Sequence, residues 1–119
     1  MSAPNLLAST TVTGKTVLSL LTTATANVLT NSSGSNTVAK VDSVVLTNYS
    51  VSATTANVVI NRSATTYYVG ATIAIPPSST LTLIGKDAGF YLEEGDVLQA
   101  NAAANTSVSL TAAYELIAS

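Results

Sequence analysis

Residues 90–104 read FYLEEGDVLQANAAA, and this stretch decides the interpretation of the fold. A short apolar run, Phe90–Leu92, precedes the polar turn Glu93–Asp96, and a second strand-like run, Val97–Ala100, follows it. The turn contains a glycine, which tolerates a positive φ, next to an aspartate, which can bond the nearby backbone. The stretch therefore predicts a hairpin or a corner late in an all-β domain. It does not have the pattern of a catalytic site.

The last part of the chain carries the clearest strand pattern. Between residues 107 and 117, polar or small side chains alternate with apolar ones, namely Val108, Leu110, Ala112, Tyr114 and Leu116. A period of two predicts a strand with one buried face and one polar face. No segment shows the period near 3.6 that a helix requires.

Shorter strand patterns fill the preceding sequence, with turns roughly every ten residues. They cover residues 15–21, 26–30, 37–49, 56–62, 66–75 and 80–84. The strands at 37–49 and 56–62 have a short polar connection, so we expect them to form an antiparallel pair. Pro76 and Pro77 should end the 66–75 strand, because proline cannot donate to a β-ladder. We interpret the polar loop 31–36 as solvated.

Taken together, these patterns predict an all-β fold, a single antiparallel β-sandwich or jelly-roll-like domain over residues 15–119. Residues 1–14 are interpreted as an extended N-terminal arm, whose one apolar spot is Leu6–Leu7. A frayed terminus is the usual alternative, although it would leave both leucines exposed. We therefore take Pro4, Leu6 and Leu7 as candidate assembly residues that dock on a neighbouring subunit, and both readings stay open.

Composition narrows the classes of function. The 119-residue chain has no Cys and no His, so thiolate chemistry is excluded and the commonest general base and metal ligand are missing. Only 8% of the residues are charged, against a typical ~25%. The net charge of -2 leaves no basic surface, so we expect no nucleic-acid partner. No run approaches ~20 apolar residues, and no membrane partner is expected.

A surface of Thr, Ser and Asn with few charges suits packing against other subunits or survival outside a cell. The alternative is an ordinary stable β-protein with a neutral polar face. The start, MSAPNLLAST, has neither the basic residues nor the apolar core of a secretory signal.

Four carboxylates lie close together in the sequence: Asp87, Glu93, Glu94 and Asp96. Their spacing fits no EF-hand loop, so solvated turn charges are the default, and cation binding stays open. A glycosidase-like pair would need an aromatic-rich cleft, and aromatic residues are only 5% of the chain. Tyr67, Tyr68, Tyr91 and Tyr114 could form a stacking platform for sugars or bases, or lie at the edges of the core. We assign no catalytic, cofactor-binding or metal-binding residue.

Several segments in order carry a family resemblance: KVDSVVLTN at 40–48, ANVVINR at 56–62, TLTL at 80–83, LEEGDVLQA at 92–100 and VSLTAAYELI at 108–117. This order resembles small tailed-phage virion proteins of the decoration, neck or fibre-associated kind. The LEEGD corner is its most specific part, and the first 20 residues lie outside it.

The resemblance implies a β-sandwich without enzyme activity or cofactor, in a symmetric and often trimeric assembly. The expected location is the virion, with the host cytoplasm before assembly, and the expected partners are further copies of the chain and the major capsid protein or another virion protein. The favoured role is capsid decoration or cement. A neck, tail or fibre component and a carbohydrate-binding adhesin module, which would use the tyrosines, are the alternatives.

Overall fold

The computed structural model describes residues 11–85 and 89–118, and every regular element in that part of the chain is a β-strand. The strands are β1 (Thr11–Leu20), β2 (Ala26–Thr30), β3 (Thr37–Asn48), β4 (Thr54–Arg62), β5 (Thr65–Ile75), β6 (Ser79–Ile84), β7 (Phe90–Leu92), β8 (Val97–Ala102) and β9 (Val108–Ala118). Over the same residues, the structure contains no helix that is long and apolar enough to cross a membrane.

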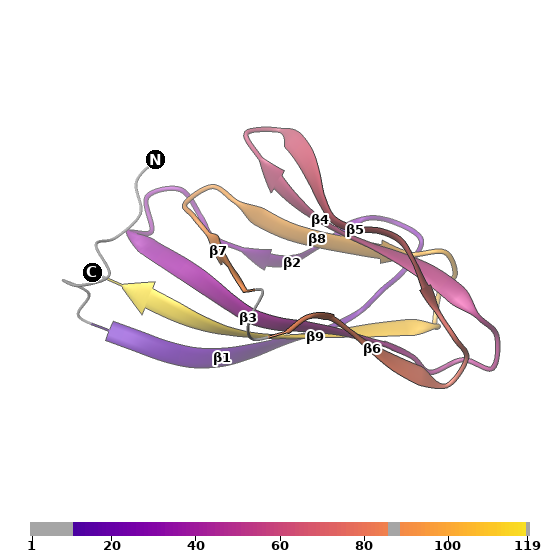
Figure 1. Cartoon of the computed structure of the whole chain (residues 1–119). Coiled ribbons are helices and arrows are strands. Elements are labelled where there is room, and N and C mark those ends of the chain that lie inside the picture. The colour runs from indigo at the N-terminus through magenta and orange to yellow at the C-terminus, as the bar shows by residue number, and fades with distance from the viewer. Residues whose placement is uncertain (1–10, 86–88, 119) are drawn as a thin grey trace.

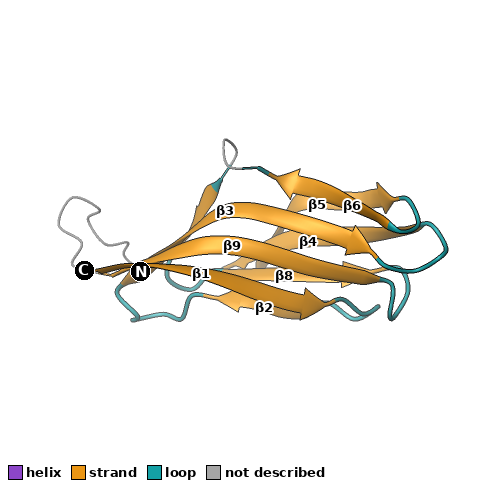
Figure 2. Ribbon diagram, turned by 90° about the horizontal axis from the view of Figure 1, so that it is seen from below, coloured by secondary structure: helices purple, strands orange, loops and turns teal. Residues whose placement is uncertain are grey.

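The strands form two antiparallel sheets that pack face to face as a β-sandwich (Figure 1). The five-stranded sheet has the order β1-β9-β3-β6, with β7 also paired to β3. The four-stranded sheet has the order β2-β8-β4-β5. Figure 2 shows the two layers from below, with β1, β9 and β3 in one and β2, β8 and β4 in the other. The chain passes repeatedly from one sheet to the other, as in the jelly-roll type of sandwich.

One expected pairing is wrong. The strands predicted at 37–49 and 56–62 correspond to β3 and β4, which belong to different sheets. The buried side chain of Asn48 shapes the connection, because its Nδ2 donates to the carbonyls of Ser52 (2.8 Å) and Ile75 (3.0 Å). This anchored loop turns the chain across the sandwich instead of back along the same sheet. Strand patterns alone do not distinguish these two kinds of connection.

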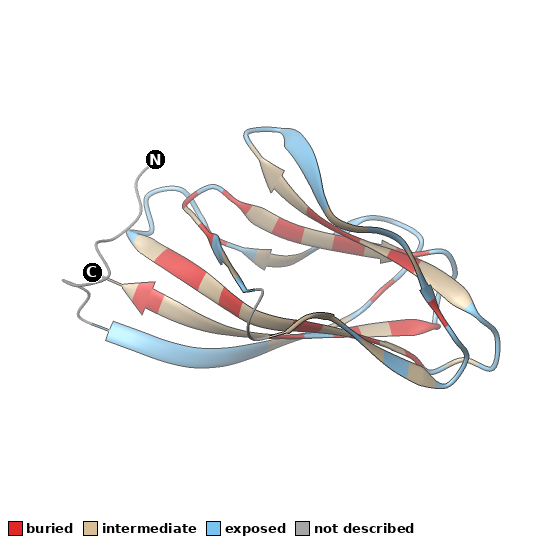
Figure 3. Ribbon diagram, viewed as in Figure 1, coloured by how far each residue is buried: buried red, intermediate tan, exposed pale blue. Residues whose placement is uncertain are grey.

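The core lies between the sheets, where alternate residues of β3, β4, β8 and β9 are buried (Figure 3). The predicted inward face of the last strand is confirmed, since Val108, Leu110 and Ala112 are completely buried. Tyr114 and Leu116 continue that face and pack against the core while half-buried. The pairing of β9 with β3 shifts register between Val41 and Ser43, which interrupts the simple alternation there.

The first strand starts earlier than the sequence pattern indicated. We expected an arm up to residue 14, whereas β1 begins at Thr11 and pairs with β9 over its whole length, from Thr11 opposite Ala118 to Leu20 opposite Ser109. The β-ladder, not the side-chain pattern, sets this boundary. The candidate assembly residues Pro4, Leu6 and Leu7 lie outside the described residues.

Candidate functional site

The turn Glu93–Asp96 forms a corner, not a hairpin, because β7 belongs to the five-stranded sheet and β8 to the four-stranded one. Gly95 has a φ of 90°, and the Asp96 N–H closes the turn on the carbonyl of Glu93 at 3.0 Å. The corner is tied to Asn31 by two backbone bonds. Gly95 N–H donates to the Asn31 carbonyl at 2.7 Å, and Asn31 N–H donates to the Asp96 carbonyl at 3.0 Å.

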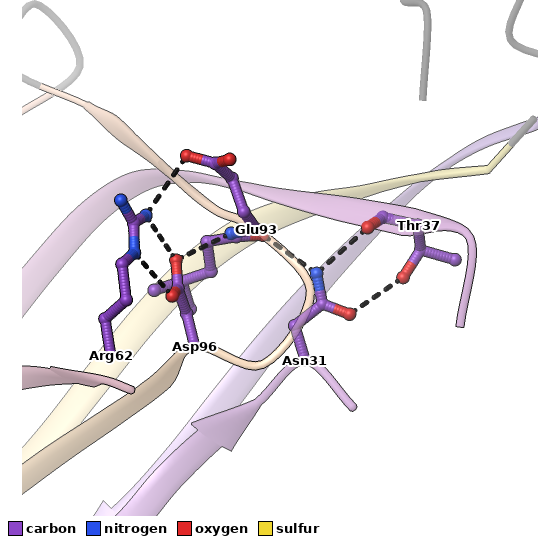
Figure 4. A network of polar contacts seen from close by, with 6 residues as sticks. Asn31, Thr37, Arg62, Glu93 and Asp96 are labelled. Atoms are coloured by element: carbon purple, nitrogen blue, oxygen red, sulfur yellow. Dashed lines mark hydrogen bonds and ion pairs between the residues drawn. The ribbon is translucent and has the colours of Figure 1, made fainter. Parts of the chain in front are cut away.

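An ion pair lies behind this corner (Figure 4). Arg62, the last residue of β4, donates from Nε to Asp96 Oδ1 (2.7 Å) and from Nη2 to Asp96 Oδ2 (2.6 Å). This two-pronged geometry is the strong form of an arginine–carboxylate contact. Asp96 is fully buried, and Oδ2 also accepts the Glu93 N–H at 2.8 Å. The Glu93 carboxylate, about two-fifths exposed, completes the cluster at 3.1 Å from Arg62 Nη2.

The loop 31–36 is fastened to the same corner, so the expectation of a solvated loop is wrong for part of it. Asn31 is buried, and its Nδ2 donates to the carbonyls of Leu92 (2.8 Å) and Thr37 (3.0 Å). The buried carboxylate of Glu94 accepts the N–H groups of Gly34 (3.0 Å) and Asn36 (2.8 Å). A run of turn-forming residues predicts the loop, but it does not reveal these partners.

The electrostatics of the corner favour the ion pair. Burial disfavours the charged form of Asp96, but the hydrogen bonds from Arg62 and from Glu93 N–H, together with the charge of Arg62, outweigh burial and lower the pKa of that carboxyl. The hydrogen bond to Asp96 is the main reason that the pKa of Arg62 is raised. Both groups therefore stay charged over the ordinary pH range.

The buried carboxylates of the corner, Glu94 and Asp96, connect the loop 31–36 and strand β4 to the turn. The default interpretation as solvated turn charges is wrong for Glu94 and Asp96, which are buried and hydrogen-bonded. Asp87 lies outside the described residues. Within residues 11–85 and 89–118, no group of three or more carboxylates is arranged to hold a metal ion.

The corner yields a first prediction. Gly95→Ala should lower the free energy of unfolding by about 1–2 kcal/mol, because a Cβ is strained at a positive φ. Urea denaturation monitored by circular dichroism measures the change. Gly85→Ala is the matched control, since a Cβ there meets no atom within 4 Å, and it should stay within about 0.5 kcal/mol of the original chain. Equal losses in the two variants would show that the φ of Gly95 is not needed.

The tyrosines do not come together as one stacking platform. Tyr68 lies opposite Val59 and Tyr67 opposite Ile60, so successive tyrosines of β5 point to opposite faces of the four-stranded sheet. Tyr91 lies on β7 of the other sheet, opposite Lys40, and Tyr114 packs against the core. Any recognition of a sugar or base by these side chains must use one of them at a time.

The outer face of the five-stranded sheet carries a patch without charge. Leu18 of β1 lies opposite Thr111 of β9, which in turn lies opposite Val45 of β3. The neighbouring row is Leu20, Ser109 and Thr47. We call these six residues the neutral patch. Its two leucines are exposed by 73% and 72%, and Leu18 and Leu20 line a shallow groove of about 280 Å³ with Ser109 and Thr111.

The outer face of the four-stranded sheet has a different chemistry. It carries the side-chain amides of Asn27, Asn57, Asn61, Gln99 and Asn101. The sequence pattern places Asn57, Val59 and Asn61 on one face of a strand, but it does not reveal that the amides of β2 and β8 lie alongside them. That requires the strand order β2-β8-β4, which joins segments more than 40 residues apart.

A scan against protein-family models finds none that matches this chain, and a search of curated proteins finds no match either.

Proposed function

We propose that this protein is a non-enzymatic structural component of a phage particle, with capsid decoration or cement as its role. Two things support the proposal: the resemblance of the LEEGD corner and its flanking strands to small virion proteins, and the form of β1. Viral capsid domains are among those built as jelly rolls, which is an analogy of fold alone. The observation that carries the proposal is the open edge of β1.

Strand β1 is long and has few of the features that usually protect an edge strand from pairing with another chain. Its first six residues are exposed, as are Leu18 and Leu20 further along. Among the described strands, only β9 pairs with it. Proteins usually protect such an edge with proline, several charges or a bulge, because its free N–H and C=O groups recruit another strand. Here Lys15 is the one charge, no proline occurs, and the β1–β9 register is regular.

The occupant we propose for this edge is a second copy of the chain. An antiparallel pairing of two β1 strands centred on Thr16 keeps each face continuous and places Val12 opposite Leu20 of the second copy. The same register places Gly14, around which a Cβ would meet no atom within 4 Å, opposite Leu18. Lys15 then faces Val17 and not another lysine. Pairing of β1 with a different edge of the next copy would instead close the trimer that the resemblance implies.

The surface area that the β1 edge can bury is too small for a stable interface by itself. Ten residues of strand extend over about 34 Å, and a sheet with its side chains is about 10 Å thick, so the edge buries roughly 700 Å² counted on both partners. A stable interface usually buries at least about 1,200 Å². The rest must come from the neutral patch, from the shell or from residues 1–10, which include the candidate assembly residues Pro4, Leu6 and Leu7.

The proposed position in the phage particle is tested by counting the copies of this chain in each virion. Quantitative mass spectrometry of purified virions should find this chain at a number comparable to the major capsid protein, or at one third of it. A handful of copies per particle would favour the neck, tail or fibre alternative. Absence from the particle would remove the structural proposal.

The edge is tested in solution. The double variant Leu18→Glu with Leu20→Glu should weaken self-association at least about tenfold, because charge would lie against the uncharged face of the next copy. Sedimentation velocity over a concentration series measures the dissociation constant. Val51→Glu, at an exposed position in the loop between β3 and β4, is the control and should leave the dissociation constant unchanged.

Deletion of residues 2–10 stops short of β1, so the domain should fold and associate more weakly. Unchanged self-association of the variant with Leu18→Glu and Leu20→Glu would exclude the β1 edge as the site of self-association.

A further inference from the structure

Side-chain amides are concentrated on one face of the four-stranded sheet. Six Asn or Gln side chains occur on the described strands, and five of them lie on this face: Asn27, Asn57, Asn61, Gln99 and Asn101. The sixth, Asn48, is buried in the loop connection described above. Asparagine is depleted in strands, where β-branched and aromatic residues are preferred. We call the five amides, together with Tyr68, the amide face.

Hydrogen bonds fix four of the five amides in place, those of Asn27, Asn57, Gln99 and Asn101. Gln99 Nε2 donates to Asn27 Oδ1 at 2.9 Å, and Asn57 Nδ2 donates to Asn101 Oδ1 at 2.9 Å. Asn101 Nδ2 donates onward to Thr25 Oγ1 at 3.1 Å. The β5 strand is irregular beside Asn57, where Thr72 has a φ of 49° and donates its N–H to Asn57 Oδ1 at 2.7 Å. The amide groups are therefore oriented before any ligand arrives.

These bonds use only part of each amide. A side-chain amide has two N–H donors and an oxygen that accepts twice. Within the described residues, the bonds above occupy one donor and one acceptor position of Asn57, and one donor position of Gln99. Adjacent donors and acceptors thus remain available along the face, on side chains that are already ordered.

The amide face contains a hollow, which is the proposed centre of the binding site. It encloses about 180 Å³ and is lined by Asn57, Gln99, Asn101 and Tyr68, with Thr25, Thr66, Val59 and Ala100. Tyr68 is 66% exposed. The lining contains no charged residue. Pockets for drug-sized molecules usually measure about 300–1,000 Å³, so this hollow suits one ring of a longer chain that continues across the face.

We propose that the amide face binds a neutral carbohydrate chain. Each sugar hydroxyl both donates and accepts, and an amide offers both partners side by side. Tyr68 supplies a flat apolar surface with a polar tip, against which the C–H face of one sugar ring packs. With no Lys or Arg among the lining residues, the site offers no positive charge to phosphate or sulfate groups. The site lies on the opposite sheet from β1 and the neutral patch, so it is independent of the proposed self-association.

The test uses the whole chain and defined probes. Hexasaccharides of glucose, mannose, galactose and N-acetylglucosamine are titrated into ¹⁵N-labelled protein, with a heparin hexasaccharide as the charged comparison. At least one neutral probe should shift amide resonances of β4, β5 and β8. Tyr68→Ala and Asn101→Ala should each weaken that binding about tenfold, while both variants keep the spectrum of a folded protein.

Tyr91→Ala is the matched control, because it removes an exposed tyrosine from the other sheet, and its affinity should stay within about twofold of the original. Three results would overturn the proposal: no resonance shifts with any neutral probe at about 10 mM, binding of the heparin probe alone, or equal affinity of the Tyr68→Ala and Tyr91→Ala variants.

Discussion

A Leu110→Asp chain should fail to fold. Leu110 of β9 is fully buried, with Leu46 of β3 opposite it, and belongs to the core between the two sheets. Truncation of a buried leucine to alanine alone costs about 2–5 kcal/mol. A carboxylate at the same place adds the cost of burying a charge that has no partner. The total approaches or exceeds the ~5–15 kcal/mol by which domains are usually stable.

The measurement is circular dichroism and a ¹⁵N correlation spectrum of the purified variant, which should show an unfolded chain. Thr111→Asp is the control on the adjacent residue, whose side chain points to the opposite, exposed face. It introduces the same charge in the same strand and should fold with a loss of about 1 kcal/mol or less. A folded Leu110→Asp protein would show that the facing of β9 is not what the burial pattern indicates.

The sequence predicts the strands well and their partners poorly, for a physical reason. Alternation of apolar and polar residues follows from the burial of one sheet face, so it reveals Val108, Leu110 and Ala112 directly. Pairing is decided by contacts between segments far apart in the chain. The connection after Asn48 illustrates this, because the carbonyl of Ile75, 27 residues away, helps to hold the loop that carries β3 to the other sheet.

The corner was the best-predicted site, and its chemistry was still misjudged. Glycine and aspartate predict the reversal at residues 93–96. They do not indicate that Arg62, 34 residues earlier, binds Asp96. From the sequence alone, Asp96 is therefore interpreted as a solvated charge. The amide face was missed for the same reason, since its donors and acceptors come from three strands that are separate in sequence.

The two proposed interactions, self-association and carbohydrate binding, use different sheets. The five-stranded sheet offers an open edge and the neutral patch, which suit contact with another protein surface of the same kind. The outer face of the four-stranded sheet offers ordered amides and the exposed Tyr68, which suit a hydrated neutral ligand. A block that attached to a particle by the first could present the second outward. Self-association and carbohydrate binding can therefore succeed or fail separately in the experiments above.

Replacement of Arg62 by methionine should cost about 3 kcal/mol at pH 7, at the low end of the 3–5 kcal/mol for breaking a buried ion pair, because Arg62 is itself partly exposed. Methionine keeps the aliphatic stem and removes the guanidinium. Asp96 then keeps the Glu93 N–H as a partner but loses both bonds from Arg62. Urea denaturation of the two chains measures the difference, and Lys40→Met is the control. Its ion pair with Asp42, at 3.9 Å between partly exposed side chains, should contribute less than about 1 kcal/mol.

The pH dependence of that cost identifies Asp96 as its source. In the original chain, the folded pKa of Asp96 lies below its unfolded value of about 3.9, so its contribution is complete above about pH 5 and is lost as the pH falls through the folded pKa. Without Arg62, burial dominates and the folded pKa rises above the unfolded value, so protonation relieves the variant as the pH falls. The gap between the two chains should therefore narrow from pH 7 towards pH 4. A gap that stays constant over this range would mean that the cost of losing Arg62 does not come from the charge of Asp96.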